Sequence, residues 1–280
     1  MRLRYVLLLF VASFVAAAGY TGWYYGLREV PDAEADIETV FKYGSIGAEG
    51  TSVPTAIWRA LPELCPDLLP GGYASLGFIT EPGANRPIGI TERTVGVSRA
   101  AFNCATCHAG TVRTSDGAEP QVIVGMPAHR VDIQRYTQFM GQCIGSDRFT
   151  AALAMPVIRR LTPMSGLEAA FLRYVIIPAT KREVAVVKAK FAWFDSRPPF
   201  GPGRFDDINP NKADMSNDDT VGTADLVPVW NMAAHEGHAR HWDGNATNLR
   251  ESLLNSVLAA GTPANRLDVG LVERIENYLK

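Results

Sequence analysis

Two cysteines and a histidine lie together in the segment Cys104-Ala105-Thr106-Cys107-His108. This order and spacing is the attachment pattern of a c-type haem. The two thiols add to the two vinyl groups of the porphyrin, and the two-residue gap sets their separation. The next residue directs its imidazole at the iron from the same helical turn, and Asn103 is a good N-cap for that turn. We therefore predict one covalent haem c, with Cys104 and Cys107 as thioether anchors and His108 as the proximal iron ligand.

Two other uses of a C-x-x-C pair are weaker. A thioredoxin-like redox pair needs a βαβ frame, and no such pattern surrounds this segment. A structural zinc site needs a second pair of ligands, and the remaining cysteines, Cys65 and Cys143, are isolated in the sequence. In an oxidising compartment these two cysteines either pair, closing a long loop, or remain two buried thiols. The sequence leaves both alternatives open.

A second axial ligand, where one exists, has few candidates. Met126 and His129 follow His108 by 18 and 21 residues in the segment GMPAH, and each is close enough in sequence to return to the opposite face of the haem. The alternative is a turn whose methionine packs in the core. Both residues are therefore kept as distal ligand candidates.

The N-terminus predicts export. Arg2 and Arg4 precede 21 uncharged residues, 5–25, which is enough for a helix to cross a hydrocarbon core about 30 Å thick. The positive end is expected to stay cytoplasmic, and aromatic residues at 23–25 suit a retained interfacial end. The alternative is a cleaved signal peptide with its cleavage site near 16–18. We predict an anchor over 1–27 and one haem domain over 28–280, on the periplasmic side of a bacterial inner membrane.

Composition is that of an ordinary globular chain. Its 280 residues have a formal net charge of −2 and are 47% hydrophobic, and no basic run suggests a nucleic-acid partner. Periodicity and turn signals predict a mainly α fold, a cytochrome c-like haem domain with long loops and a small β-hairpin. Helices are expected over 32–43, 53–65, 129–144, 167–194 with a break at Pro178, and 264–280, and the hairpin over 86–97.

Two further segments carry polar groups. The long loop at 196–222 contains five aspartates, which favours a solvated acidic loop, with a calcium site as the lesser alternative because the spacing matches no EF-hand. His235, His238 and His241 follow at three-residue intervals, as either a metal site or a cluster at the surface or haem edge.

Seven segments in order carry a resemblance to a known family: FKYGSIGAE, GGYASLGF, NCATCHAG, GMPAHRVDIQRY, GRFDDINPNK, VPVWN and HWDGNATNLRESL. Together they resemble the N-terminal haem half of the rubber oxygenase-like branch of the dihaem cytochrome c peroxidase superfamily, which includes the MauG-type proteins. The resemblance covers roughly residues 38–280. It implies a mostly helical fold in which the first haem is reactive and a second haem domain supplies electrons. It also implies that Trp242 relays electrons between the two.

The chain departs from that pattern in three ways. It has no second C-x-x-C-H, so a second haem domain belongs to a longer chain or to a partner, or is not used. No acid follows in LAAGTPAN, where the peroxidases place a glutamate that helps to split a peroxide bond. No histidine occurs in TVGTADLVP, where they hold a loop histidine on the resting haem. The last departure favours a vacant distal position unless one of the HEGHARH imidazoles fills it.

These features predict a redox protein without naming its substrate. One hypothesis is an oxidoreductase whose open iron position takes dioxygen or peroxide, with a redox partner protein or a second haem domain as its electron source. The alternative is a pure electron carrier with a six-coordinate haem. A haem-based sensor is a third class, and no signalling domain supports it.

Overall fold

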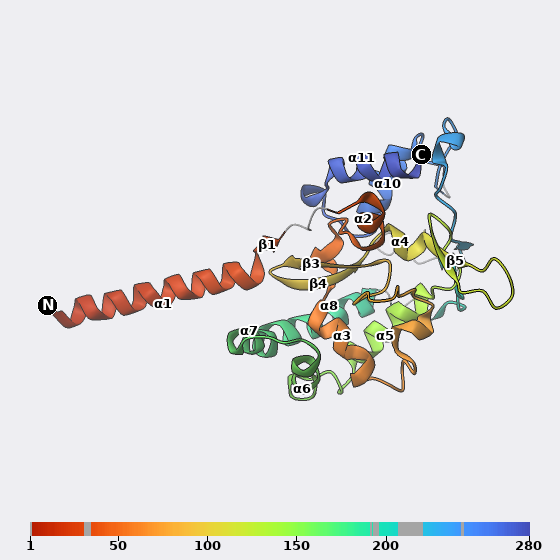
Figure 1. Ribbon diagram of the computed structural model, residues 1–280. Coiled ribbons are helices and arrows are strands. Elements are labelled where there is room, and N and C mark those ends of the chain that lie inside the picture. The colour runs from red at the N-terminus through yellow and green to blue at the C-terminus, as the bar shows by residue number, and fades with distance from the viewer. Residues whose placement is uncertain (1, 31–34, 191, 193–195, 207–220, 242–243) are drawn as a thin grey trace.

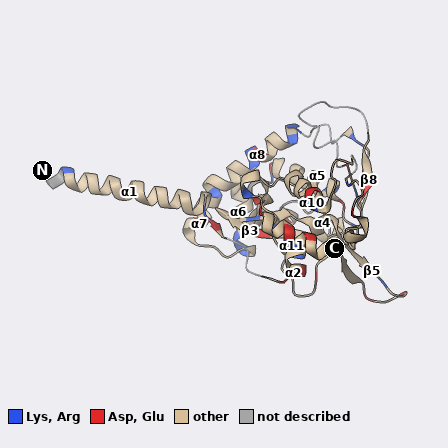
Figure 2. Ribbon diagram, turned by 90° about the horizontal axis from the view of Figure 1, so that it is seen from above, with Lys and Arg blue, Asp and Glu red and all other residues tan. Residues whose placement is uncertain are grey.

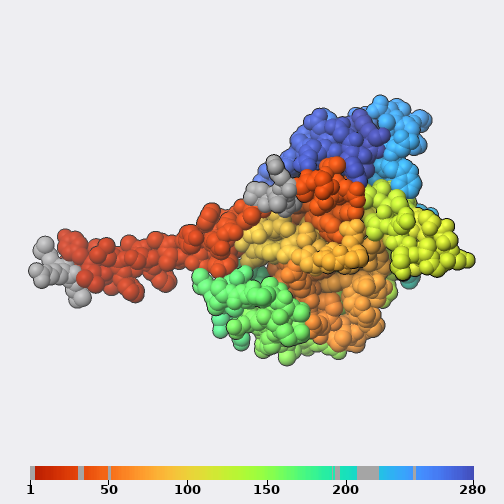
Figure 3. Space-filling model, in the orientation of Figure 1, coloured from red at the N-terminus to blue at the C-terminus, as the bar shows by residue number. Residues whose placement is uncertain are grey.

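The computed structural model describes the chain except residues 1, 31–34, 191, 193–195, 207–220 and 242–243. About 52% of the chain is helical, and three small sheets accompany the helices in the described residues. The mainly α prediction is therefore confirmed at the level of fold class. One long helix projects from a compact body (Figure 1, Figure 3).

The projecting helix is α1, Arg2–Gly26. Its segment Arg4–Gly26 is long and apolar enough to cross a membrane, and a signal sequence passes the same test. Its C-terminal end contacts the body. The Gly96 N–H donates to the Arg28 carbonyl at 2.7 Å, and Glu29 forms ion pairs with Arg266 at 2.8 Å and Arg93 at 3.5 Å.

α1 is followed by strand β1 of a four-stranded antiparallel sheet, whose strand order is β1-β3-β4-β2. Its strands are β1 Glu29–Val30, β2 Val53–Pro54, β3 Ile90–Val95 and β4 Val97–Phe102. The hairpin predicted over 86–97 exists, but its second arm is 97–102, because the turn is a single residue at Gly96. That residue has φ +71°, and a Cβ there would lie 2.3 Å from the Tyr25 carbonyl oxygen.

Helices on one side of the sheet enclose the largest core. They are α3 Thr55–Leu64, η2 Gly72–Leu76, α5 Ile133–Gly145 and α6 Ala151–Leu161. The predicted helices at 53–65 and 129–144 correspond to α3 and α5. Fully buried Leu61, Ile144 and Ile158 pack at their centre. Cys65 and Cys143 form a disulfide between the ends of α3 and α5, with Cα atoms 5.9 Å apart. The sequence left open whether these cysteines pair or remain free thiols, and in the structure they pair.

The predicted helix at 167–194 is continuous but not uniform over the part that the structure describes, 166–190. It consists of α7 Gly166–Phe171, a π-helical turn η3 Leu172–Ile176, and α8 Ile177–Lys190. Pro178 has no N–H to donate to the carbonyl four residues earlier, and the wider π turn lies directly before it. The break expected at Pro178 is therefore a change of helix type.

A second helical layer covers the other side. It contains α2 Ile37–Tyr43, α10 Leu249–Ala259 and α11 Val269–Leu279, with short 3₁₀ turns η1 Ala48–Thr51, η5 Met232–His235 and η6 Ala264–Arg266. α2 begins later than predicted, at Ile37, and its N-cap is Asp36, whose carboxylate accepts the Thr39 N–H at 3.0 Å. The helix predicted over 264–280 is the shorter α11.

The remaining elements surround the short helix α4, Cys104–Cys107. They are two hairpins, β5 Ala109–Val112 with β6 Gln121–Val124, and β7 Arg204–Asp206 with β8 Thr223–Asp225. α4 lies between the two helical layers. Cys104 packs against the cluster of Phe41, Leu249 and Ile275, whereas Cys107 packs against the large core.

Candidate functional site

Asn103 fixes the start of the cysteine-bearing helix, as predicted. Its Oδ1 accepts the Ala105 N–H at 3.0 Å, which caps α4. Its Nδ2 donates to the carbonyls of Phe41 at 3.1 Å and Gly44 at 3.0 Å, both at the end of α2. The buried side-chain amide of Asn103 thus accepts one hydrogen bond and donates two, so it both caps α4 and holds α4 against α2.

Gly89 holds the same helix from the other side. Its carbonyl accepts the Thr106 hydroxyl at 2.6 Å and the Asn103 N–H at 3.1 Å. Its φ is +89°, and a Cβ there would lie 2.5 Å from the Thr106 Cα. Only glycine permits this approach, because any side chain would meet the backbone of α4.

The His108 imidazole has a defined tautomer. Its Nδ1 lies 2.9 Å from the Val227 carbonyl oxygen, which can only accept, so Nδ1 carries the proton. The neutral ring then has its lone pair on Nε2, the nitrogen that ligates a metal in this arrangement. Burial lowers the pKa of His108, and the bond to Val227 offsets this only in part. The environment therefore favours the neutral, ligating form.

The Val227 carbonyl is itself held in place by the surrounding backbone. The Val229 N–H donates to the Gly125 carbonyl at 2.8 Å, and the Gly125 N–H donates to the His108 carbonyl at 2.8 Å. The segment 227–229 thus joins the β5–β6 hairpin at the residue that follows α4. Nothing in the sequence pointed to Val227, because its role uses a main-chain oxygen that every residue has.

Cys104 and Cys107 lie half-buried, one helical turn apart, and neither belongs to the Cys65–Cys143 disulfide. Burial raises the pKa of the Cys104 thiol to about 11. The reactive thiol of a redox pair is a thiolate, which needs a lowered pKa. The surroundings of Cys104 therefore disfavour the thioredoxin-like interpretation.

Apolar side chains surround the segment on the side of Cys104. The partly buried members of its cluster include Ile79, Val122, Val124, Val229, Met232 and Leu253. Val227 and Trp230 lie on the adjoining segment and remain 43% and 46% exposed. A haem needs such apolar surface beside its axial ligand. The imidazole tautomer, the two half-buried thiols and this surface together fit a covalent haem.

The two distal candidates lie close to the proximal segment. Met126 packs against Gly110, with its Sδ 3.0 Å from the position of a Cβ on that glycine, and the Ala128 N–H donates to the Cys107 carbonyl at 2.9 Å. His129 is exposed, and its Nδ1 lies 3.3 Å from the Pro127 carbonyl. Ligation by Met126 or His129 stays a prediction.

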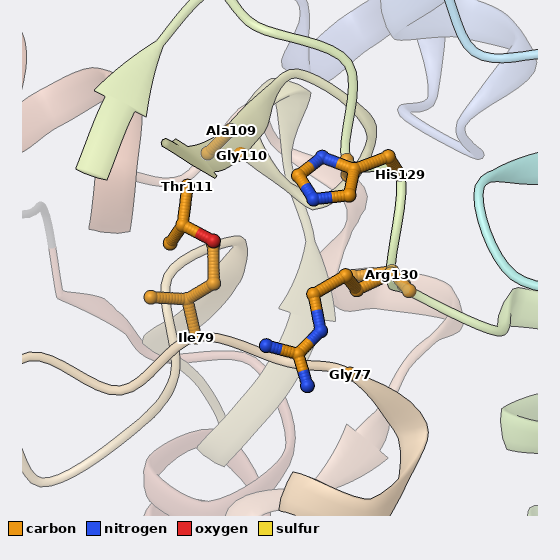
Figure 4. Close-up of a pocket in the computed structure, with 9 residues that line it drawn as sticks. Gly77, Ile79, Ala109, Gly110, Thr111, His129 and Arg130 are labelled. Carbon is orange, nitrogen blue, oxygen red and sulfur yellow. The ribbon is translucent and has the colours of Figure 1, made fainter. Parts of the chain in front are cut away.

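A small pocket opens beside His129. His129 and Arg130 line it on one side and Ile79 and Thr111 on the other (Figure 4). It is a shallow hollow that encloses essentially no space of its own, unlike typical ligand pockets, which enclose roughly 300–1,000 Å³.

The other predicted residues are only partly placed. Trp242 lies outside the described residues, so its role as an electron relay stays a prediction. His235, His238 and His241 are exposed and share no α-helix, with 6.5 Å between the ring centres of the first two. Within the described ranges, no group of three or more His, Cys, Asp or Glu side chains is arranged to hold a metal ion.

The acidic loop is described at its two ends. Asp206 is fully buried, and its carboxylate accepts the Gly222 N–H at 3.2 Å. The other four aspartates of the loop, at 207, 214, 218 and 219, lie outside the described residues. The calcium alternative therefore stays a prediction.

Comparison with known proteins adds no relative. No family model, no curated protein and no solved structure matches this chain. The functional assignment must therefore come from the chemistry of the residues around α4.

Proposed function

We propose that this chain is an exported, membrane-tethered c-type cytochrome that carries one covalent haem and has a redox role. Cys104 and Cys107 are the thioether anchors and His108 is the proximal ligand. α1 supplies the tether, on the periplasmic side of a bacterial inner membrane. The resemblance to the dihaem peroxidase superfamily belongs to the same proposal.

The observation that carries the proposal is the hydrogen bond from His108 Nδ1 to the Val227 carbonyl. It orients an imidazole with Nε2 available, directly after two cysteines held in one capped helical turn. A C-x-x-C-H segment with no haem function would need no such fixed tautomer. Proximal histidines commonly donate their second ring N–H to a carbonyl, which orients the ring and raises its basicity.

The chain's own residues have three tasks in this mechanism. The cysteine sulfurs hold the porphyrin through both thioethers, so that it cannot dissociate. Val227 orients His108 and keeps its lone pair directed to the metal. The apolar side chains near Cys104 exclude water from the porphyrin. When bound, the haem supplies one-electron exchange and, at an open iron position, a site for dioxygen or peroxide.

The direct test is covalent haem attachment. The full chain is expressed in cells competent in cytochrome maturation, purified in detergent and denatured, and porphyrin mass and haem stain are then measured. We expect one haem per chain, weaker attachment in the single variants Cys104→Ala and Cys107→Ala, and none in the double variant. The control is Cys65→Ala/Cys143→Ala, which removes two other cysteines and should retain the haem. A wild-type chain without added porphyrin mass contradicts the proposal.

The sixth iron position separates an oxygen- or peroxide-activating oxidoreductase from a pure electron carrier. Met126 is the observation that favours the carrier, because its thioether lies in the loop hydrogen-bonded to Cys107. Carbon monoxide is added to the ferrous protein at neutral pH, and the optical spectrum is followed. Prompt binding supports the oxidoreductase. Binding that becomes prompt only in Met126→Ala supports the carrier and identifies its ligand.

A further inference from the structure

We propose that α7 and η3, residues 166–176, form a second membrane contact that lies on anionic lipid headgroups beside α1. This inference rests on the proposed anchoring by α1. It adds that the body is held to the bilayer at two places and therefore has one preferred orientation.

An apolar stripe runs along these two elements. Leu167, Phe171, Tyr174 and Val175 recur at helical spacing, so they share one side of the helix. Leu167 is 59% exposed, Tyr174 72% and Val175 46%. Single exposed apolar residues are ordinary, but a continuous stripe on a helix marks an interaction surface.

The stripe is continuous with the predicted membrane span. Phe171 stacks on Tyr25, in the last turn of α1, with ring centres 4.9 Å apart and planes inclined by 26°. That end of α1 also carries Tyr20 and the half-exposed Trp23, aromatic residues that suit the headgroup level of a bilayer. α7 lies beside this end of α1 (Figure 1, Figure 3), so the stripe is at the depth of lipid headgroups.

The charge of this region suits an anionic surface. Residues 151–190 contain seven basic and two acidic side chains, a formal net charge of +5 in a chain whose total is −2. Arg159 and Arg173 are exposed, and Arg173 lies over the Tyr174 ring, whereas Arg160 is ion-paired with Glu63. Basic ribbon segments follow α8 in Figure 2. An exposed apolar stripe flanked by basic residues is the pattern of a helix that lies in a membrane interface.

The junction between α1 and the body limits rotation of one against the other. The Gly96 N–H binds the Arg28 carbonyl, and Glu29 pairs with Arg266 and Arg93. Since α1 enters the bilayer, this junction brings α7 to the surface and not to open solvent. In both views α4 lies farther from α1 than β3 does, and the hairpin of β5 lies beyond it at the end of the body away from α1 (Figure 1, Figure 2). A redox partner is therefore expected to reach the haem segment from the aqueous side.

The test uses the full chain in lipid nanodiscs containing phosphatidylglycerol or only phosphatidylcholine. A nitroxide is attached at Tyr174→Cys and, as the matched control, at Arg113→Cys, an exposed position after β5. Collisions with oxygen, which concentrates in the bilayer, are compared with collisions with a water-soluble nickel complex.

We expect a higher oxygen-to-nickel ratio at 174 than at 113 in anionic discs, and a lower ratio at 174 in phosphatidylcholine discs. Arg173→Gln should reduce the equilibrium constant for contact with anionic lipid about fivefold. Equal ratios at 174 and 113, in a chain that remains in the discs, would show that residue 174 does not contact lipid and would overturn the proposal. A chain that does not co-elute with the discs overturns the anchor, and this proposal with it.

Discussion

Replacing Gly89 by alanine tests whether this residue positions α4, the helix that carries the two proposed haem anchors. The new Cβ would lie 2.5 Å from the Thr106 Cα, 2.6 Å from the Thr106 nitrogen and 2.8 Å from its hydroxyl oxygen. Two of these atoms are backbone, so no side-chain rotation relieves the overlap. The helix must move away from β3, and the hydrogen bonds to the Gly89 carbonyl lengthen as it moves.

The expected cost has two parts. A side chain at positive φ costs about 1–2 kcal/mol, and overpacking against fixed neighbours costs about 1–3 kcal/mol more. Gly89→Ala should therefore lower the free energy of unfolding by about 2–5 kcal/mol. Gly83 provides the matched control, because its φ is +80° and no atom lies within 4 Å of its Cβ position. Gly83→Ala should cost only the conformational part.

The assay is guanidinium unfolding of the haem-loaded full chain in detergent, followed by far-ultraviolet circular dichroism and by the Soret band. The shift in midpoint, at unchanged slope, gives the change in stability. Haem yield during expression is measured as well. Equal destabilisation by the two alanine variants, with equal haem yield, would refute the role assigned to Gly89.

Three further changes have defined outcomes. Asn103→Ala removes the cap of α4 and leaves two carbonyls at the end of α2 without their donor, so it should cost about 1–3 kcal/mol, measured by denaturant titration. Reducing the Cys65–Cys143 disulfide, which closes a separation of 78 residues, should cost about 4 kcal/mol in the same titration while the haem stays attached. Burial raises the pKa of Glu276, but hydrogen bonds from Arg250 and Lys280 outweigh this and hold it below its ordinary value. The Glu276 carboxylate therefore stabilises the fold at pH values above the ordinary carboxyl pKa, and this stabilisation is lost as the pH falls through its lowered pKa. In thermal melts at decreasing pH, Glu276→Gln should therefore lose less stability than the wild type.

Local features of the site were predictable from the sequence. The spacing of Cys104, Cys107 and His108 predicted one short helical turn, and the structure has it as α4. Asn103 before that turn predicted the cap that the structure has, because both partners lie two residues apart. Helices α3 and α5 followed from their periodicity, within a few residues at each end. In all these cases the interacting groups are close in sequence.

The long-range features were not predictable in the same way. The pairing of β1 with β3 joins residues about 65 positions apart, and neither strand is long enough to give a distinct pattern. The hairpin extends beyond its predicted end at residue 97, because its turn is at Gly96 and its second strand runs to Phe102. The π-helical turn before Pro178 depends on how the helix packs against the rest of the protein, and hydrophobic periodicity in the sequence does not reveal such packing.

The hydrogen bond between His108 and Val227 shows how local sequence and long-range packing combine at the site. The two residues are 119 positions apart, so the imidazole acquires its tautomer only when the segment after β8 has packed against the β5–β6 hairpin. If the chain carries the proposed haem, its thioether attachment would involve the local segment, whereas orientation of His108 depends on the tertiary fold. A chain unable to close this contact would then keep a porphyrin through both sulfurs and lose control of the imidazole, because the carbonyl that selects Nε2 would be missing. The proposal therefore treats covalent attachment and axial ligation as separate properties, the first dependent on five consecutive residues and the second on the fold around them.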